Sequence, residues 1–127
     1  MSVALNHTIV WCHDQTRSAE FLAQILGRPK PTRFMHFLVV ELDNGVSLDF
    51  MEQDGKIAGQ HYAFLISEAE FDAVFARIET QELDYWADPG RTQAKQIYHH
   101  NGGRGLYFRD PDGHLLEVLT RPYSSDG

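Results

Sequence analysis

Hydrophobic and polar positions along the chain predict short strands and two helices. Residues 5–11 are rich in β-branched and aromatic side chains, which is typical of a strand. Apolar residues then recur at helical spacing over 15–26, where Asp14 can cap the start of the helix and Gly27 its end. The pattern continues with two strands joined by an Asp-Asn-Gly turn, 34–42 and 46–52.

The second half of the chain repeats this order. Residues 61–66 predict a strand, and Ser67 followed by Glu70 predicts a capping box at the start of the next helix. Residues 105–109 and 115–120 predict a hairpin around an Asp-Pro-Asp-Gly turn. Each half therefore has the order β-α-β-β, with room for one further short strand, near 30–35 and 84–100.

Two pairs of segments match each other in the same order, which indicates an internal duplication. The strand that begins near His7 matches the strand at His61, since both are short apolar runs opened by a polar residue and a histidine. The strand that carries Asp49 after an Asn-Gly turn matches the strand that carries Glu117 after an Asp-Gly turn. We expect one domain over 1–127, built from modules of about 4–53 and 60–121.

Charge and cysteine content narrow the classes of function. The 127 residues hold 11 Lys and Arg against 18 Asp and Glu, a formal charge of −7 that repels nucleic acids and anionic membranes. Cys12 is the single cysteine, so no disulfide can form within the chain and a reducing compartment fits best. With no signal peptide or apolar span visible in the sequence, we expect a cytoplasmic protein with a small-molecule substrate.

Three polar residues stand among apolar neighbours on predicted strands: His7, His61 and Glu117. A carboxylate in that setting is costly unless it is paired, protonated or bound to a cation. Two imidazoles and one carboxylate would bind a divalent Fe, Mn, Ni, Co or Zn ion and leave positions open for water or substrate. Alternatively, each histidine is a hydrogen-bonded structural residue and Glu117 faces solvent.

Further candidates surround this set. By symmetry with Glu117, Asp49 is the fourth member of this set of candidate metal ligands. Three ligands would suit oxygen chemistry, whereas a fourth ligand would favour proton transfer at a bound enediolate. Tyr107 would share the face of Glu117 by alternation across the hairpin, although a packed core tyrosine is an equal reading. His99 or His100, before a Gly-Gly loop, could serve as an acid or base near neutral pH or simply face solvent.

The sequence resembles the vicinal oxygen chelate superfamily, which includes glyoxalase I, fosfomycin-resistance proteins, extradiol dioxygenases and bleomycin-resistance proteins. The resemblance covers about residues 4–121 and is carried by LNHTIV at 5–10, RSAEFLAQILG at 17–27 and GLYFRDPDGHLLEV at 105–118. It implies an α+β fold in which two tandem βαβββ modules form a half-open mixed-sheet barrel around a divalent metal. It also implies a homodimer, often with ligands contributed across the interface.

Matched position by position, the resemblance implies that His7, His61 and Glu117 are metal ligands and that Tyr107 lies near the metal. Asp49 stands where glyoxalase I has a glutamate, a departure that favours a ring-cleavage type of dioxygenase over a glyoxalase. Two alternatives remain: a glyoxalase-type lyase or isomerase that uses Asp49 as fourth ligand, and a metal-free protein that sequesters a drug.

Overall fold

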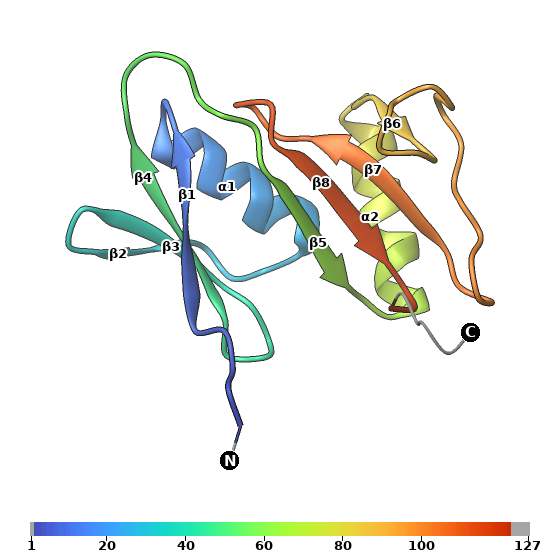
Figure 1. Ribbon diagram of the computed structural model, residues 1–127, viewed down its shortest axis with the longest axis horizontal. Coiled ribbons are helices and arrows are strands. Elements are labelled where there is room, and N and C mark those ends of the chain that lie inside the picture. Colours follow the sequence, from blue (N-terminus) through green and yellow to red (C-terminus); the bar gives the residue numbers. More distant parts are fainter. Residues whose placement is uncertain (1, 123–127) are drawn as a thin grey trace. The chain divides into compact units, whose positions relative to one another are not determined.

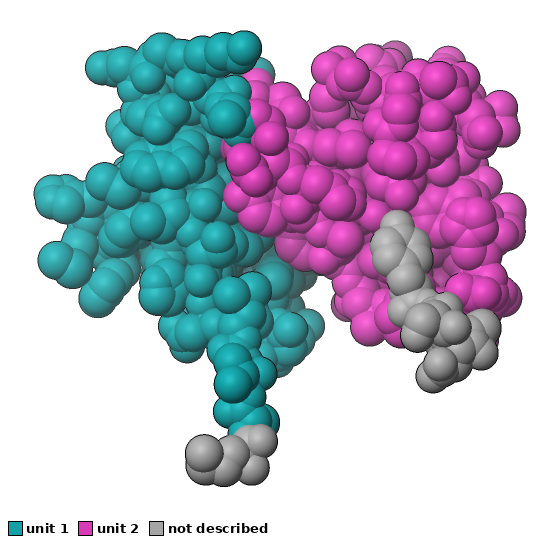
Figure 2. All heavy atoms as spheres, in the orientation of Figure 1, with its two compact units in different colours: residues 1–58 teal, residues 59–127 magenta. Residues whose placement is uncertain are grey.

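The computed structural model describes residues 2–122 and divides the chain into two compact units, residues 1–58 and 59–127 (Figure 2). Unit 1 contains five elements: β1 (His7–Cys12), α1 (Gln15–Leu26), β2 (Thr32–Phe34), β3 (Phe37–Glu41) and β4 (Ser47–Glu52). Unit 2 contains the corresponding five: β5 (His61–Leu65), α2 (Glu68–Thr80), β6 (Tyr85–Trp86), β7 (Gly105–Arg109) and β8 (Leu115–Leu119). Each predicted module lies inside one unit.

The two units have the same sheet topology (Figure 1). The strand order is β1-β4-β3-β2 in unit 1 and β5-β8-β7-β6 in unit 2. In each sheet the first strand of the module pairs in parallel with the last, and the remaining pairs are antiparallel. The predicted α+β fold of two βαβββ modules is therefore confirmed, including the short strands expected near 30–35 and 84–100.

The register of the parallel pairs is the same in both units. Ile9 of β1 lies opposite Asp49 of β4, two residues after His7. Ala63 of β5 lies opposite Glu117 of β8, two residues after His61. The repeat seen in the sequence thus places one histidine and one carboxylate at equivalent sites in each sheet.

Helix α1 begins and ends where its capping residues predict. The Asp14 side chain accepts a hydrogen bond from the Arg17 backbone N–H at 3.1 Å, and Gly27 ends the helix with φ at 70°, a conformation that glycine adopts without strain. Buried residues of α1, such as Leu22 and Ile25, pack toward β3 and β4. The helix therefore covers one face of the sheet of unit 1.

Helix α2 starts with the predicted capping box. The Ser67 hydroxyl accepts a hydrogen bond from the Glu70 backbone N–H at 3.1 Å, and the Glu70 side chain accepts one from the Ser67 N–H at 3.2 Å. These bonds satisfy two donors that the first helical turn would otherwise leave unpaired.

Replacing Ser67 with alanine should lower the free energy of unfolding by about 1 kcal/mol, because the Glu70 backbone N–H in the first turn of α2 loses its acceptor. Urea unfolding followed by circular dichroism measures this change. Ser2→Ala, at an exposed residue outside every helix and strand, is the control. An unchanged midpoint for Ser67→Ala would show that the cap contributes nothing.

In unit 2 the two faces of the sheet differ in character. Leu106, Phe108, Leu116 and Val118 alternate on one face and, with the buried residues of α2, form the hydrophobic core of this unit. Tyr107 and Glu117 occupy the opposite face by the same alternation. Within residues 2–122, no helix has the length and apolar character that a bilayer span requires.

One predicted strand differs from the structure. The pattern over 34–42 predicts a continuous strand, but β3 starts only at Phe37, since Met35 turns the chain with φ at 54° between β2 and β3. A methionine gives no turn signal, because positive φ is adopted mostly by glycine and asparagine. The sequence pattern therefore does not reveal the turn between β2 and β3, because this turn lies within a largely apolar run.

Candidate metal centre

A histidine and a buried glutamate meet on adjacent strands of unit 2. His61 opens β5, Glu117 lies in β8, and His61 Nε2 is 3.2 Å from Glu117 Oε1. The Glu117 side chain is fully buried, whereas the His61 side chain is 47% exposed. The pair is therefore open to solvent on the side of the imidazole and closed on the side of the carboxylate.

The second nitrogen of His61 is held by the backbone. His61 Nδ1 lies 3.0 Å from the Leu115 carbonyl oxygen, which can only accept, so Nδ1 carries a proton and donates it. A neutral His61 ring then presents a lone pair at Nε2. This lone pair and Glu117 Oε1 are two electron-pair donors that face each other, an arrangement that a shared proton or cation stabilises. Metal-binding histidines commonly show this contact between the other ring nitrogen and a carbonyl.

Two tyrosines complete the surroundings of Glu117. Tyr107 of β7 lies directly opposite Glu117 in the antiparallel register, is buried, and has its ring centroid 5.9 Å from that of His61. The Tyr98 hydroxyl donates a hydrogen bond to Glu117 Oε2. The structure thus brings together the predicted residues His61, Glu117 and Tyr107, and adds Tyr98.

Tyr98 was not among the candidates from sequence. It lies in the irregular segment between β6 and β7, where no periodicity shows which way a side chain points. The sequence feature that could have drawn attention to Tyr98 is its position just before the paired histidines 99 and 100.

The other two predicted ligands, His7 and Asp49, belong to unit 1. His7 Nδ1 lies 2.8 Å from the Asn6 side-chain oxygen, which leaves Nε2 available in the same way as in His61. Asp49 is buried in β4 and accepts a hydrogen bond from the Ser47 hydroxyl at 2.9 Å. Their role as metal ligands stays a prediction.

Within residues 2–122, no group of three or more His, Cys, Asp or Glu side chains is gathered closely enough to hold a metal ion. Of the predicted metal ligands, His61 and Glu117 are in contact in the described part of the chain. The larger set that includes His7 and Asp49 stays a prediction.

The paired histidines after Tyr98 have different surroundings. The His100 ring stacks on the Tyr98 ring with centroids 4.5 Å apart. His99 is exposed and lies near Glu68 at the start of α2. Hydrogen bonds from Thr120 and Arg104, and to a lesser extent the charge of His99, hold the pKa of Glu68 below its usual value. His100 is therefore the member of the pair in contact with the surroundings of Glu117.

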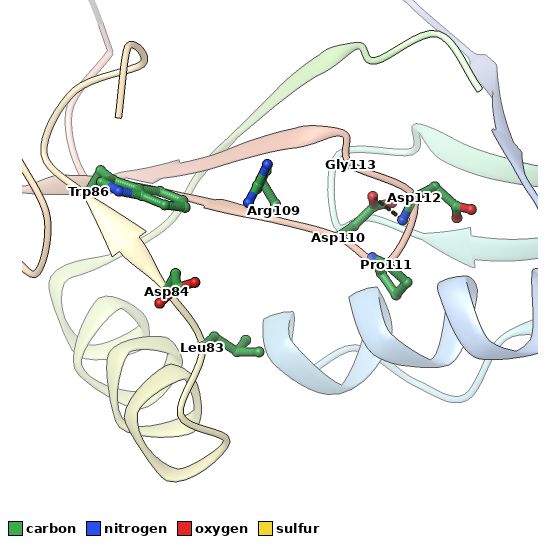
Figure 3. Close-up of a pocket in the computed structure, with 8 residues that line it drawn as sticks. All are labelled: Leu83, Asp84, Trp86, Arg109, Asp110, Pro111, Asp112 and Gly113. Carbon is green, nitrogen blue, oxygen red and sulfur yellow. Dashed lines mark hydrogen bonds between the residues drawn. The ribbon is translucent and has the colours of Figure 1, made fainter. Parts of the chain in front are cut away.

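A cavity of about 500 Å³ lies at the turn between β7 and β8 (Figure 3). Trp86 lies opposite Tyr107 in the register, so it belongs to the same sheet face, and the Arg109 guanidinium is 5.6 Å from its ring centroid. Burial raises the pKa of the Asp110 carboxyl in this turn, although Asp110 accepts hydrogen bonds from two backbone N–H groups. The cavity thus borders the face that carries His61, Tyr107 and Glu117.

Paired βαβββ modules, with a histidine at the start of the first strand and a carboxylate in the last, define a class of metal-binding and ligand-binding proteins. The chain belongs to the glyoxalase/bleomycin resistance protein/dioxygenase superfamily, whose family model matches residues 4–118. The resemblance inferred from the sequence is therefore confirmed.

Individual relatives differ in activity. The solved structure of oxidase ChaP-H2 is 54% identical, with a TM-score of 0.96 and 100% of both chains covered. Glutathione transferase FosA from Serratia marcescens is 29% identical over 124 residues, which cover 93% of this chain and 81% of that protein. Metallothiol transferase FosB from Shouchella clausii (strain KSM-K16) is 45% identical over 62 residues, which are 47% of this chain and 37% of that protein.

Proposed function

We propose that this protein is a divalent-metal-dependent oxidase or dioxygenase that acts on a small substrate with two neighbouring oxygen atoms. The observation that carries the proposal is the His61–Glu117 pair, in which a backbone-held imidazole and a buried carboxylate oxygen face each other at 3.2 Å. The 54% identity to an oxidase over the whole chain supports oxidative chemistry over the transferase chemistry of the more distant FosA.

His61, Glu117 and His7 would hold the ion in this proposal. Two imidazole nitrogens and one carboxylate oxygen suit divalent Fe, Mn, Co, Ni or Zn. The local geometry fits a metal site, because an oxygen acceptor holds Nδ1 of each histidine and Nε2 is then the nitrogen that would bind the ion. An ion bound there would supply a Lewis-acid centre with open positions for a chelating substrate and dioxygen.

The residues around the pair have separate tasks in this proposal. Tyr107, buried beside Glu117, places a hydroxyl from which a proton can pass to or from a substrate oxygen. The full burial of Glu117 keeps water from competing for its oxygens. His99, exposed near Glu68, would reach a substrate only if its loop closed over the site.

A second candidate reaction is proton transfer in a lyase or isomerase, with Asp49 as fourth ligand. The observation that favours it is the burial of Asp49 at the position in β4 that Glu117 occupies in β8. The Ser47 hydroxyl already binds one of its oxygens, so Asp49 would reach an ion with the other or through water.

We also propose that the protein works as a homodimer. The face of β1 that carries His7 also carries Ile9 and Trp11, which are 37% and 38% exposed in the single chain. Apolar side chains exposed beside a predicted ligand fit burial against a second copy.

The test begins with metal content. Protein purified without chelator should hold about one divalent ion per ligand set. His61→Ala should lose the ion, whereas His36→Ala, at an exposed histidine of unit 1, should keep it. Oxygen uptake with catechols would support the oxidase or dioxygenase. Turnover of a hemithioacetal without oxygen would favour the lyase, and a protein without metal that binds an aromatic drug would contradict both.

A further inference from the structure

Tyr98 contacts the carboxylate oxygen that faces away from His61. Glu117 Oε1 faces His61 Nε2, and the Tyr98 hydroxyl donates to Oε2. Glu117 is fully buried, and its two oxygens contact different residues. A freely rotating carboxylate would offer either oxygen, or both, to an ion.

The position of Tyr98 is fixed by its backbone. Tyr98 N–H donates to the Gly105 carbonyl at 2.9 Å, and Gly105 N–H donates to the Tyr98 carbonyl at 3.1 Å. These two bonds pair Tyr98 with the first residue of β7. The Tyr98 ring then lies directly over Gly105, where any Cβ would collide with it. Gly105 is therefore the residue that admits the ring to the site.

Neighbouring rings hold the tyrosine on its other sides. The Tyr107 ring centroid is 5.8 Å away and the His100 ring is stacked at 4.5 Å. Tyr98 itself is buried, so its hydroxyl is directed at Glu117 rather than at solvent.

We propose that Tyr98 is a positioning residue for the metal ligand Glu117. Its hydroxyl occupies Oε2 and holds the carboxylate in one orientation, so that Glu117 would present Oε1 alone to an ion. An ion held in this way would keep one more open position than a carboxylate bound through both oxygens would allow. This inference rests on the proposed metal site and adds the coordination mode of its glutamate.

The test compares two tyrosine variants by cobalt(II) titration of the purified full-length protein. Tyr98→Phe removes one oxygen and keeps the ring, and it should weaken cobalt(II) binding by about 10- to 100-fold. The weaker binding follows because Glu117 loses the hydroxyl that holds its side chain in place. The visible absorption of bound cobalt(II) should also change, because the carboxylate then has no fixed orientation toward the ion. Tyr85→Phe, whose ring packs on Phe75 of α2, should change neither.

Gly105→Ala provides a second variant, which keeps the tyrosine but moves its hydroxyl away from Glu117. Its added methyl group displaces the Tyr98 ring, so it should reproduce the weaker binding and the altered spectrum of Tyr98→Phe. Agreement between the two variants supports the positioning role.

Two outcomes would overturn the inference, and they are distinguishable. If Tyr98→Phe melts at a lower temperature but binds cobalt(II) with unchanged affinity and spectrum, Tyr98 only stabilises the fold, and the proposed metal site stands. If the unmodified protein and Tyr85→Phe also fail to bind cobalt(II), the proposed function fails together with the inference.

Discussion

Replacing Glu117 with glutamine should abolish metal binding and reduce turnover by about 10³-fold or more, because an ion at the proposed site would lose its one anionic ligand from this sheet. The fold should survive. The glutamine carbonyl can accept the hydrogen bond of Tyr98, and its amide can donate to His61 Nε2, so both partners of the carboxylate remain satisfied. Metal analysis, oxygen uptake and a melting curve measure the three effects separately.

Glu79→Gln is the matched control, since Glu79 is exposed at the end of α2. It should keep both the ion and the activity. A Glu117→Gln protein that retains its metal and its turnover would show that Glu117 is a structural residue paired with His61 and Tyr98.

The second large effect concerns His7 and His61, which lie in different modules. His7→Ala and His61→Ala should each inactivate the protein. If each ligand set combines His7 of one chain with His61 of another, a mixed dimer of the two variants contains one intact set. Random subunit exchange would then restore about a quarter of the unmodified activity.

The activity of the mixture, measured as a function of protein concentration and mixing time, reports how far the subunits of the two variants have exchanged. Two preparations of the same variant, mixed in the same way, are the control and should stay inactive. If no activity returns although mixed dimers form, then all ligands of a set come from one chain. This outcome would contradict the shared site while leaving the ligand residues themselves in place.

Local signals in the sequence predicted most of the fold. Asp14, Gly27 and Ser67 mark helix ends because their side chains, or the absence of one, satisfy backbone groups within a few residues. Met35 shows the limit of such signals: its positive φ is imposed by the pairing of β2 with β3, which the local sequence does not encode.

The contact between His61 and Glu117 could be predicted for the same reason. His61 and Glu117 lie on regular strands, so the alternation of side chains was enough to place them on one face. Tyr98 reaches Glu117 from an irregular segment, through a backbone bridge to Gly105 and a ring that depends on the missing side chain of that glycine. Contacts of this kind are set by the assembled fold, and no period in the sequence reveals them.

The shared register of β1–β4 and β5–β8 also bears on how this scaffold can evolve. Each module carries an acidic residue at the equivalent position of its last strand, and the two side chains differ by a single methylene group, Asp49 against Glu117. Aspartate and glutamate codons differ only at the third base. One nucleotide change therefore separates this chain from one that carries a glutamate at the equivalent position of both sheets.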